Sequence, residues 1–424
     1  MRSILADLTP LRESPGFRRM WSGIALSAIG TQLTLAALSL QTYALTGSTF
    51  AVGLLGIFSL GPLIIAGLYG GSVVDAYDRR KVAIFSSMAM WIITIAVALQ
   101  AWFNLGQPWI LYVLAGLQSA AMGINQSARS AIIPRLVRAE LLPAANALNM
   151  IVFGIGASLG PMLAGVLVGS VGYNWTYSID VLTFTAALWA LFKLPALPPE
   201  GEHIRKAGLR SVVEGFQFLA QRPNIRMTFL VDLCAMIFAM PRALFPALGV
   251  IWLGGGDATA GLLLAAVAIG SLLAALFSGP LGRVNRQGLA VAVCISIWGV
   301  SIAGLGAVVL LAGKYQGEGV SPWLAAAVVL LVISGIADSI SGVFRSTILQ
   351  SATPDQMRGR LQGIFIVVVA GGPRIGDLLA GTSGDLFGEG FAALIGGLLC
   401  IAVLWFLLKL QPRFLRYDAR TPEP

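Results

Sequence analysis

Charged side chains are scarce in this sequence, since Asp, Glu, Lys and Arg together make up only 11% of its 424 residues. A soluble globular protein carries about 25% charged residues. Hydrophobic residues make up 57% of the chain, and glycine, which lets membrane helices approach closely, occurs 50 times. The composition therefore argues against a soluble fold and predicts a protein that crosses a membrane several times.

Histidine and cysteine are also rare, which limits the chemistry that the chain can support. The one histidine, His203, lies in a polar stretch, and the three cysteines lie in separate apolar runs. This spacing suits no metal site. The absence of a G-x-x-x-x-G-K-[ST] phosphate loop argues against an ATP-driven pump. We therefore expect no metal, no cofactor and no enzymatic activity, because an enzyme in the membrane would need a nucleophile with a base or metal ligands.

Long apolar runs, by contrast, are abundant. A helix needs about 20 apolar residues to cross the hydrocarbon core of a bilayer. Runs of about this length occur six times on each side of a polar break, at 20–44, 51–74, 82–103, 109–133, 146–171, 174–194, 226–251, 259–281, 288–311, 323–346, 360–382 and 389–410. We predict an all-α polytopic membrane protein in which twelve transmembrane helices form two six-helix bundles.

The polar break LPALPPEGEHIRKAGLR separates the two predicted bundles. It defines a first bundle at 1–194, a cytoplasmic linker at 195–224, and a second bundle with a cytoplasmic tail at 225–424. Five apolar residues of the linker share one helical stripe: Leu209, Val212, Val213, Phe216 and Leu219. Such a stripe is typical of a short amphipathic helix on the membrane surface, although a packed loop helix fits it equally well.

Basic residues alternate from one connection to the next. Every second connection is basic, with Arg12, Arg18, Arg19, Arg79, Arg80, Lys81, Arg135, Arg138, Arg205, Lys206, Arg210, Arg283, Arg286, Arg358, Arg360, Arg413 and Arg416. In the opposite connections only Lys314 breaks the pattern. Because basic loops stay cytoplasmic, we predict that both termini are cytoplasmic in an inner (plasma) membrane. The rule also accounts for the net charge of +9, so we expect a bilayer and no nucleic acid as partner.

The two halves of the chain repeat one another at an offset of 216 residues. ARSAIIPRLV at 128–137 matches FRSTILQSAT at 344–353, and GIGASLGPMLAG at 154–165 matches AGGPRIGDLLAG at 370–381. Glycines spaced by four occur in both copies and predict a face for close helix packing. Parallel repeats of six spans are typical of transporters whose site lies between two halves.

The segment GGSVVDAYDRRKV at 70–82 resembles the signature loop of the major facilitator superfamily. Gly71, Asp75, Arg79 and Arg80 match that pattern, while Ala76 and Asp78 replace its usual Arg and Gly. Asp75 at the membrane edge is suited to cap a helix start or to pair with a basic residue. The resemblance implies a role for this loop in gating.

The segment GASLGPMLAG at 156–165 resembles a fifth-helix motif of exporters in the same superfamily. The matching positions are Gly156, Gly160, Pro161 and Gly165. Together with LTPLRESPGFRRMW, AELLPAANALN and LQSATPDQMRGRLQGI, it resembles the enterobactin-exporter branch. The resemblance implies a monomeric secondary active exporter of a siderophore or amphiphilic drug, coupled to protons or another ion. An importer of a small organic solute and a non-transporting receptor on the same fold are the alternatives.

Familiar proton-relay positions of drug antiporters are empty in this chain. The fourth-helix motif R-x-x-Q-G reads AGLQS here, with Ala115 and Ser119, and the first span has no acidic residue. Any coupling residue must therefore lie elsewhere.

Ionisable side chains within the apolar runs are the candidates for that role, because charges at membrane depth are costly and tend to face a cavity or a partner. The candidate cavity residues are Arg242, Asp232, Arg374, Asp377, Gln32 and Gln118. The candidate coupling residues are Asp377, Asp232 and Asp338. Asp180 is a further acidic residue that could lie near the outer interface.

The spacing of the charged residues adds three structural expectations. Arg374 and Asp377 lie three residues apart, so they share a helix face and can pair. Pro241 and Pro246 predict a bend in the seventh span beside Arg242. Arg129 and Arg345 are interpreted as anchors whose long side chains snorkel to the cytoplasmic surface.

Overall fold

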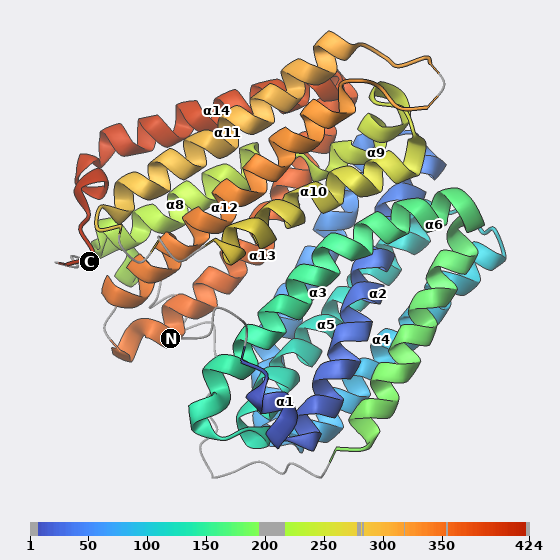
Figure 1. Ribbon diagram of the computed structural model, residues 1–424, viewed down its shortest axis with the longest axis vertical. Helices are drawn as coiled ribbons and strands as arrows, with labels where there is room; N and C mark the ends of the chain where they lie inside the picture. The colour runs from blue at the N-terminus through green and yellow to red at the C-terminus, as the bar shows by residue number, and fades with distance from the viewer. Residues whose placement is uncertain are drawn as a thin grey trace. The chain divides into compact units, whose positions relative to one another are not determined.

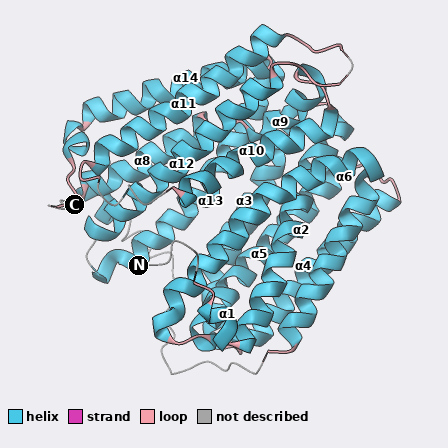
Figure 2. Cartoon of the chain, viewed as in Figure 1, coloured by secondary structure: helices cyan, strands magenta, loops and turns pink. Residues whose placement is uncertain are grey.

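The computed structural model describes residues 7–194, 217–277, 281, 284–317, 319–352 and 355–420. In this part of the chain the regular elements are helices, apart from one isolated bridge between Gly254 and Val320 (Figure 2). The predicted all-α fold is confirmed. The chain divides into two compact units, one of residues 1–45 and 58–207 and the other of residues 46–57 and 208–424.

The first unit contains five long helices around an apolar core. They are α2 (Pro15–Thr46), the later part of α3 (Thr49–Ala76), α4 (Arg79–Trp102), α5 (Pro108–Leu136) and α6 (Leu142–Phe192). The short helices α1 (Thr9–Glu13) and η1 (Ala139–Leu141) complete it. Helix α4 packs against both α5 and α6 (Figure 1). Phe17, Ala83 and Ile132, all fully buried, belong to the core at one end of these helices.

Helix α6 contains two spans in one continuous element. Its backbone is helical except at Gly172, where φ is +83° and the chain turns. A residue without a Cβ adopts this left-handed conformation without steric cost, which explains glycine at the turn. The predicted fifth and sixth spans, at 146–171 and 174–194, meet at this position.

The second unit contains the remaining long helices. They are α8 (Pro223–Phe238), α10 (Gly256–Leu276), α11 (Gln287–Ala312), α12 (Leu324–Ala352), α13 (Asp355–Phe387) and α14 (Glu389–Leu410). Helix α12 packs against α10 and α11, and α11 also packs against α14 (Figure 1). The fully buried residues Val231, Ile295 and Leu331 lie in the core between them.

The seventh predicted span is interrupted, as its two prolines led us to expect. Helix α8 ends at Phe238, and the chain continues through η2 (Arg242–Leu244), α9 (Phe245–Ala247) and a π-helical turn, η3 (Leu248–Trp252). Proline removes a backbone donor and prevents the preceding residue from adopting helical geometry easily. The break places Arg242 in a short 3₁₀ turn.

The number of spans agrees with the twelve that were predicted. Among the described residues, nine helices are long and apolar enough to cross a membrane, and one of these, Ala144–Phe192, contains two predicted spans. Helices α5 and α13 supply the other two. A last 3₁₀ helix, η5 (Pro412–Arg416), follows α14.

The predicted linker at 195–224 lies largely outside the described residues, which exclude 195–216. The division into domains at this linker and the amphipathic helix within it stay predictions. At the end of the segment, residues 217–221 are helical, and Leu219 is buried against Ile225, Phe229 and Leu349.

Candidate functional site

A cluster of six charged residues occupies the second unit. Three are acidic and three are basic, and they come from α8, η2, α12 and α13: Asp232, Arg242, Asp338, Arg345, Arg374 and Asp377. Five of the six were candidates from the sequence. Because a charge inside the membrane is stabilised mainly by an opposite charge or a polar cavity, their common location marks the candidate site.

Arg345 joins two of the acidic residues. It is 4% exposed, forms an ion pair with Asp232 through Nη1, and lies 3.5 Å from the Asp338 Oδ1 atom through Nη2. The interpretation of Arg345 as a snorkelling anchor was wrong. It is instead the buried cation that links α8 to α12.

Helix geometry explains why Arg345 turns inward. Side chains of an α-helix tilt toward its N-terminus, and Arg345 lies seven residues before the C-terminal end of α12. Its side chain therefore extends toward the middle of the helix, where Asp338 lies two turns earlier on the same face. An aspartate seven residues before an arginine is the signal in the sequence that indicates this contact.

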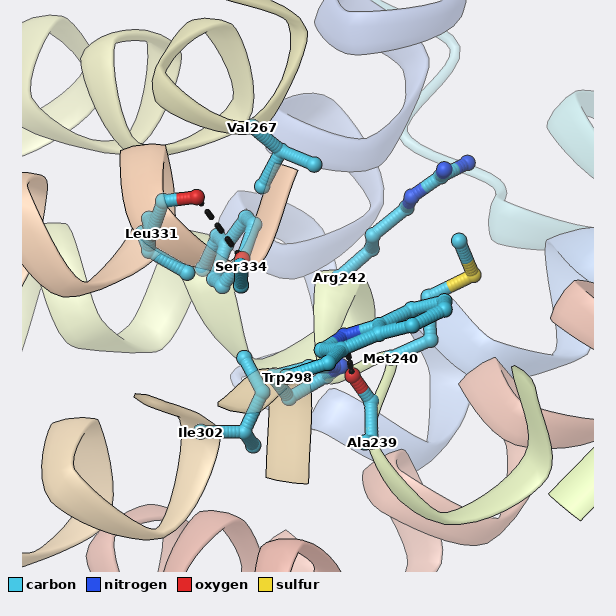
Figure 3. A pocket seen from close by; sticks show the side chains of 10 residues that line it. Ala239, Met240, Arg242, Val267, Trp298, Ile302, Leu331 and Ser334 are labelled. Carbon is cyan, nitrogen blue, oxygen red and sulfur yellow. Dashed lines mark hydrogen bonds between the residues drawn. The ribbon is translucent and has the colours of Figure 1, made fainter. Parts of the chain in front are cut away.

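Arg242 is the exposed cation of the cluster. It follows the break in the seventh span and lies within electrostatic range of Asp338, Asp377 and Arg374. Figure 3 shows its guanidinium directed away from the side chain of Trp298. Among the described residues, Arg242 forms no ion pair within 4.0 Å, so its charge is free to attract an anion.

A small cavity lies behind the break, lined by residues that include Trp298, Met240 and Ser334 (Figure 3). The Trp298 Nε1 atom donates a hydrogen bond of 2.8 Å to the Ala239 carbonyl, which the helix break leaves without a helical donor. The cavity volume of about 10 Å³ holds one water at most. The cavity therefore supports the broken helix and is too small for an organic ligand.

Arg374 and Asp377 do not form the direct ion pair that their spacing predicted. The Asp377 carboxylate accepts a hydrogen bond from the Ala243 backbone, and its Oδ1 atom has no hydrogen-bond partner among the described residues. Both residues still lie within electrostatic range of each other and of Arg242. The charges of the broken span and of α13 thus form one group.

Glycines let neighbouring helices pack closely around Arg374 and Asp377. A Cβ at Gly53 of α3 would lie 2.6 Å from the Asp377 carbonyl oxygen, and a Cβ at Gly56 would lie 3.3 Å from the Arg374 Cδ atom. On α13 itself, a Cβ at Gly376 would collide with the Met236 carbonyl of α8. The predicted close-packing role of Gly376 is confirmed.

Asp385, near the C-terminal end of α13, holds the first turn of α3. Its Oδ1 atom accepts hydrogen bonds from the Thr49 backbone nitrogen at 2.8 Å and from the Thr49 hydroxyl at 2.7 Å. Its Oδ2 atom accepts a third from the Ser48 hydroxyl. Burial acts to raise the Asp385 pKa, but the bonds from Ser48 and Thr49 together lower it below 3.8.

We expect this contact to weaken in acid. A carboxylate whose pKa is lowered in the folded state stabilises that state fully above the unfolded value of 3.8, and the effect is lost as the pH falls through the lowered pKa. Amide hydrogen exchange at Thr49, corrected for its intrinsic pH dependence, should accelerate in this range. Asp385→Ala should give the same acceleration at neutral pH, whereas Asp418→Ala should not, because the Asp418 carboxylate accepts a hydrogen bond from the nearby Arg420 backbone nitrogen.

The predicted gating loop lies in the first unit, at the junction of α3 and α4. Asp78 caps α4 by accepting hydrogen bonds from the backbone nitrogens of Arg80 and Lys81. The residue that caps the helix is therefore Asp78. Asp75 lies within α3. The side chain of Asp75 and the surroundings of Gly71 lie outside the described part of the structure. The residue that departs from the family pattern thus forms the start of the helix.

The two arginines of the loop contact helix ends of the same unit. The Arg80 Nη2 atom donates a 2.6 Å hydrogen bond to the Phe192 carbonyl, and the Arg79 Nη1 atom donates one of 3.4 Å to the Ala131 carbonyl. These bonds satisfy carbonyls near the ends of α6 and α5, so the loop ties three helices together at one end of the unit.

The exporter-like motif forms a helix contact. A Cβ at Gly160 would lie 2.5 Å from the Gln32 Cβ atom, and a Cβ at Gly156 would lie 3.1 Å from the Ala28 carbonyl oxygen. Pro161 and Gly165 are buried beside them. The predicted close packing is confirmed for Gly156 and Gly160, which bring α6 against α2.

The two glutamines proposed for a cavity differ in their surroundings. Gln32 is half-buried, with its Cβ atom close to Gly160. Gln118 is 5% exposed, and both polar atoms of its amide lack a hydrogen-bond partner among the described residues. A buried amide without partners is uncommon in folded proteins.

The arrangement of helices defines a fold class, the major facilitator fold. A crystal structure of a POT family transporter in complex with 5-aminolevulinic acid matches 95% of this chain and 97% of its own, with a TM-score of 0.74 and 11% identity. A D-xylose–proton symporter matches 93% of this chain and 98% of its own, with a TM-score of 0.71 and 14% identity. At these identities the likeness shows the fold.

Sequence relatives identify the family. The chain belongs to the transmembrane secretion effector family of the major facilitator superfamily, which it matches over residues 5–421. It is 30% identical over 425 residues to the enterobactin exporter EntS of Citrobacter koseri, covering 100% of this chain and 98% of that protein. The enterobactin exporter EntS of Escherichia coli O127:H6 is 30% identical over 410 residues, with 95% of each chain covered. The chain is a multi-pass membrane transporter and not an enzyme.

Proposed function

We propose that this transporter exports an acidic or catecholate-bearing small molecule of the siderophore class, by alternating access and in exchange for protons. The observation that carries the proposal is the exposed charge of Arg242 beside a partly buried cluster of three aspartates and two further arginines. Catecholates and carboxylates are oxygen-rich acceptors that a guanidinium binds well. The names of the two relatives support the same substrate class.

In this proposal Arg242 and Arg374 attract the substrate. Ionised Asp232, Asp338 and Asp377 accept hydrogen bonds from the catechol hydroxyl groups of the substrate, whereas a protonated carboxyl group accepts them only weakly. A proton and the substrate therefore compete for the same carboxylates, which is the condition for exchange.

Purified protein in proteoliposomes provides the test. Vesicles with an acidic lumen should accumulate enterobactin from the medium, and collapse of the pH gradient should stop the accumulation. Arg242→Ala should reduce the initial rate at least about tenfold, because a hydrogen bond to a charged group contributes about 1.5–3 kcal/mol. The matched control is Arg226→Ala, whose exposed side chain bonds, among the described residues, to the Ala220 carbonyl.

Two results would contradict the proposal. Failure to accumulate enterobactin under any gradient, with uptake of a cationic amphiphile instead, would assign the protein to drug export. Equal transport by Arg242→Ala and the wild type would remove this arginine from the substrate site.

Asp377→Asn is expected to flatten the pH dependence of transport while leaving folded protein in the membrane. The substitution keeps the size of the side chain and removes the charge that changes on protonation. Arg374→Ala alone should be more damaging than Arg374→Ala combined with Asp377→Asn, because the single change leaves Asp377 with less neutralising charge. Transport rates between pH 6 and 8, compared with Asp257→Asn at the start of α10, would measure the effect. Wild-type pH dependence in Asp377→Asn would exclude this residue from coupling.

We also propose that the protein is a monomer in a bacterial inner membrane with both termini in the cytoplasm. The alternating basic connections support this orientation. Alkaline phosphatase fused after residue 424 should be inactive, and green fluorescent protein at the same place should fluoresce. The opposite result would invert the topology.

A further inference from the structure

Asp180 is a buried carboxylic acid that the proposed transport site does not use. It lies on the second half of α6, eight residues after the kink at Gly172, and is 0% exposed. The Thr34 hydroxyl of α2 donates a 2.6 Å hydrogen bond to its Oδ2 atom, and the Thr183 hydroxyl donates one of 3.0 Å to its Oδ1 atom. All of its hydrogen-bond partners are neutral hydroxyl groups.

Opposite charge is missing from the helices around Asp180. The spans at 20–45, 82–128 and 142–192 contain no Lys, Arg, His or Glu, and Asp180 is their only Asp. The next charged residue after Asp180 is Lys193, which directly follows the end of α6. On α5 it is Arg129, which forms no ion pair with a described side chain. The second unit, by contrast, gives its buried aspartates three arginines.

Other titratable groups near Asp180 are tyrosines, which are neutral at physiological pH. Tyr177 lies one turn earlier on α6, is fully buried, and donates its hydroxyl to the Gln41 Oε1 atom at 2.8 Å. Tyr173 stacks against Tyr177, and Tyr43 lies on α2. Among the described residues of the first unit, the carboxyl group of Asp180 thus forms no ion pair.

Space for the carboxyl group is provided by a glycine. A Cβ atom at Gly30 of α2 would collide with both the Asp180 Oδ1 atom and the Thr183 hydroxyl. The carboxyl group therefore fits into a recess of the neighbouring helix, where water cannot replace the missing counter-charge. An ionised carboxylate in such a place is very unfavourable, whereas a neutral acid can both donate to and accept from the two hydroxyls.

We propose that Asp180 is a proton-binding site of the first unit, in which the carboxyl group is held as a neutral acid between the hydroxyls of Thr34 and Thr183. The site is distinct from the charge cluster of the second unit. It depends on the packing of α2 against α6, so any separation of these helices would let water reach the carboxyl group and release the proton. The inference does not depend on the identity of the substrate.

Infrared spectroscopy of the purified protein in lipid, without substrate, tests this directly. At pH 7 the wild type should show the C=O stretch of a protonated carboxylic acid, with a shift to lower frequency in D₂O. Asp180→Asn should remove that band. Thr34→Val should keep the band and move it to higher frequency, because the acid loses a hydrogen-bond partner. Asp257→Asn serves as the control and should leave the band in place.

Two outcomes would overturn the proposal. The first is a wild-type spectrum at pH 7 from which Asp180→Asn removes no carboxylic acid band. The second is a band that disappears when sodium ions are added, since the residues would then bind a metal cation in place of a proton. If Asp180→Asn does not fold, the Thr34→Val and Thr183→Val shifts still decide the question, because an unchanged band in both would show that the acid lies elsewhere.

Discussion

Arg345→Ala is expected to destabilise the protein more than any other single substitution in the charge cluster, by about 3–5 kcal/mol. Removal of the guanidinium leaves Asp232, whose side chain is 2% exposed, as a buried carboxylate without its ion-pair partner, and it also deprives Asp338 of a neighbour. Detergent-solubilised protein should lose most of its folded fraction in fluorescence-detected size exclusion, and the remaining fraction should melt at a lower temperature.

A charge-balanced double variant distinguishes the ion pair from simple loss of packing. Arg345→Ala combined with Asp232→Asn removes both charges, so folded yield should largely return while transport stays low. Arg138→Ala is the matched control, because its ion pair with Glu13 is exposed and such pairs contribute about 0–1 kcal/mol. If the double variant is no more stable than Arg345→Ala, the loss of stability comes from lost packing around the arginine side chain and not from the broken ion pair.

Gly160→Leu is expected to abolish folded, active protein. Even the first atom of a new side chain would lie 2.5 Å from the Gln32 Cβ atom and 2.9 Å from the Leu33 backbone nitrogen. The remaining atoms of leucine have no space unless α6 moves away from α2. Overpacking in a well-packed interior costs about 1–3 kcal/mol, and a backbone contact that cannot rotate aside should exceed this range. Folded yield and transport in proteoliposomes measure the effect.

Gly169→Leu is the control on the same helix, because a Cβ there meets nothing within 4 Å. It should behave like the wild type. Gly376→Leu, at the matching position of the second half, should be as damaging as Gly160→Leu, since its new Cβ would collide with the Met236 carbonyl. Wild-type transport by Gly160→Leu would mean that this contact opens without consequence during the transport cycle.

Local features of the sequence were sufficient to predict the helices and their close contacts. The apolar runs predicted twelve spans because a bilayer requires a minimum length of apolar helix. The four-residue spacing of Gly156 and Gly160, repeated at Gly372 and Gly376, predicted the faces on which helices approach, since glycine at such a spacing has few other uses in a membrane helix. Pro241 and Pro246 predicted the interruption of the seventh span by removing backbone donors.

Partners between helices could not be predicted in the same way. The spacing of Arg374 and Asp377 indicated a shared face, yet Asp377 bonds to the Ala243 backbone, because the broken span brings backbone donors to it. The position of Arg345 near a helix end predicted a surface anchor, but its side chain tilts toward the N-terminus of α12 and reaches Asp232 and Asp338. The Asp180 carboxyl group accepts a hydrogen bond from Thr34, which lies 146 residues earlier in the chain, and no local pattern in the sequence connects the two residues.

The bonds from Ser48 and Thr49 to Asp385 have a consequence for biosynthesis. These residues are separated by 337 and 336 positions, so the ribosome needs tens of seconds, at about 5–20 residues per second, to deliver the aspartate after the start of α3 has emerged. During that time the Ser48 hydroxyl, which accepts a hydrogen bond of 3.1 Å from the Ala51 backbone nitrogen, is the local cap of the helix. A nascent chain released before residue 385 would have only the Ser48 hydroxyl as a cap and would lack the Asp385 carboxylate. The start of α3 would then be less stable in an unfinished chain than in a finished one, and membrane quality-control proteases could distinguish the two.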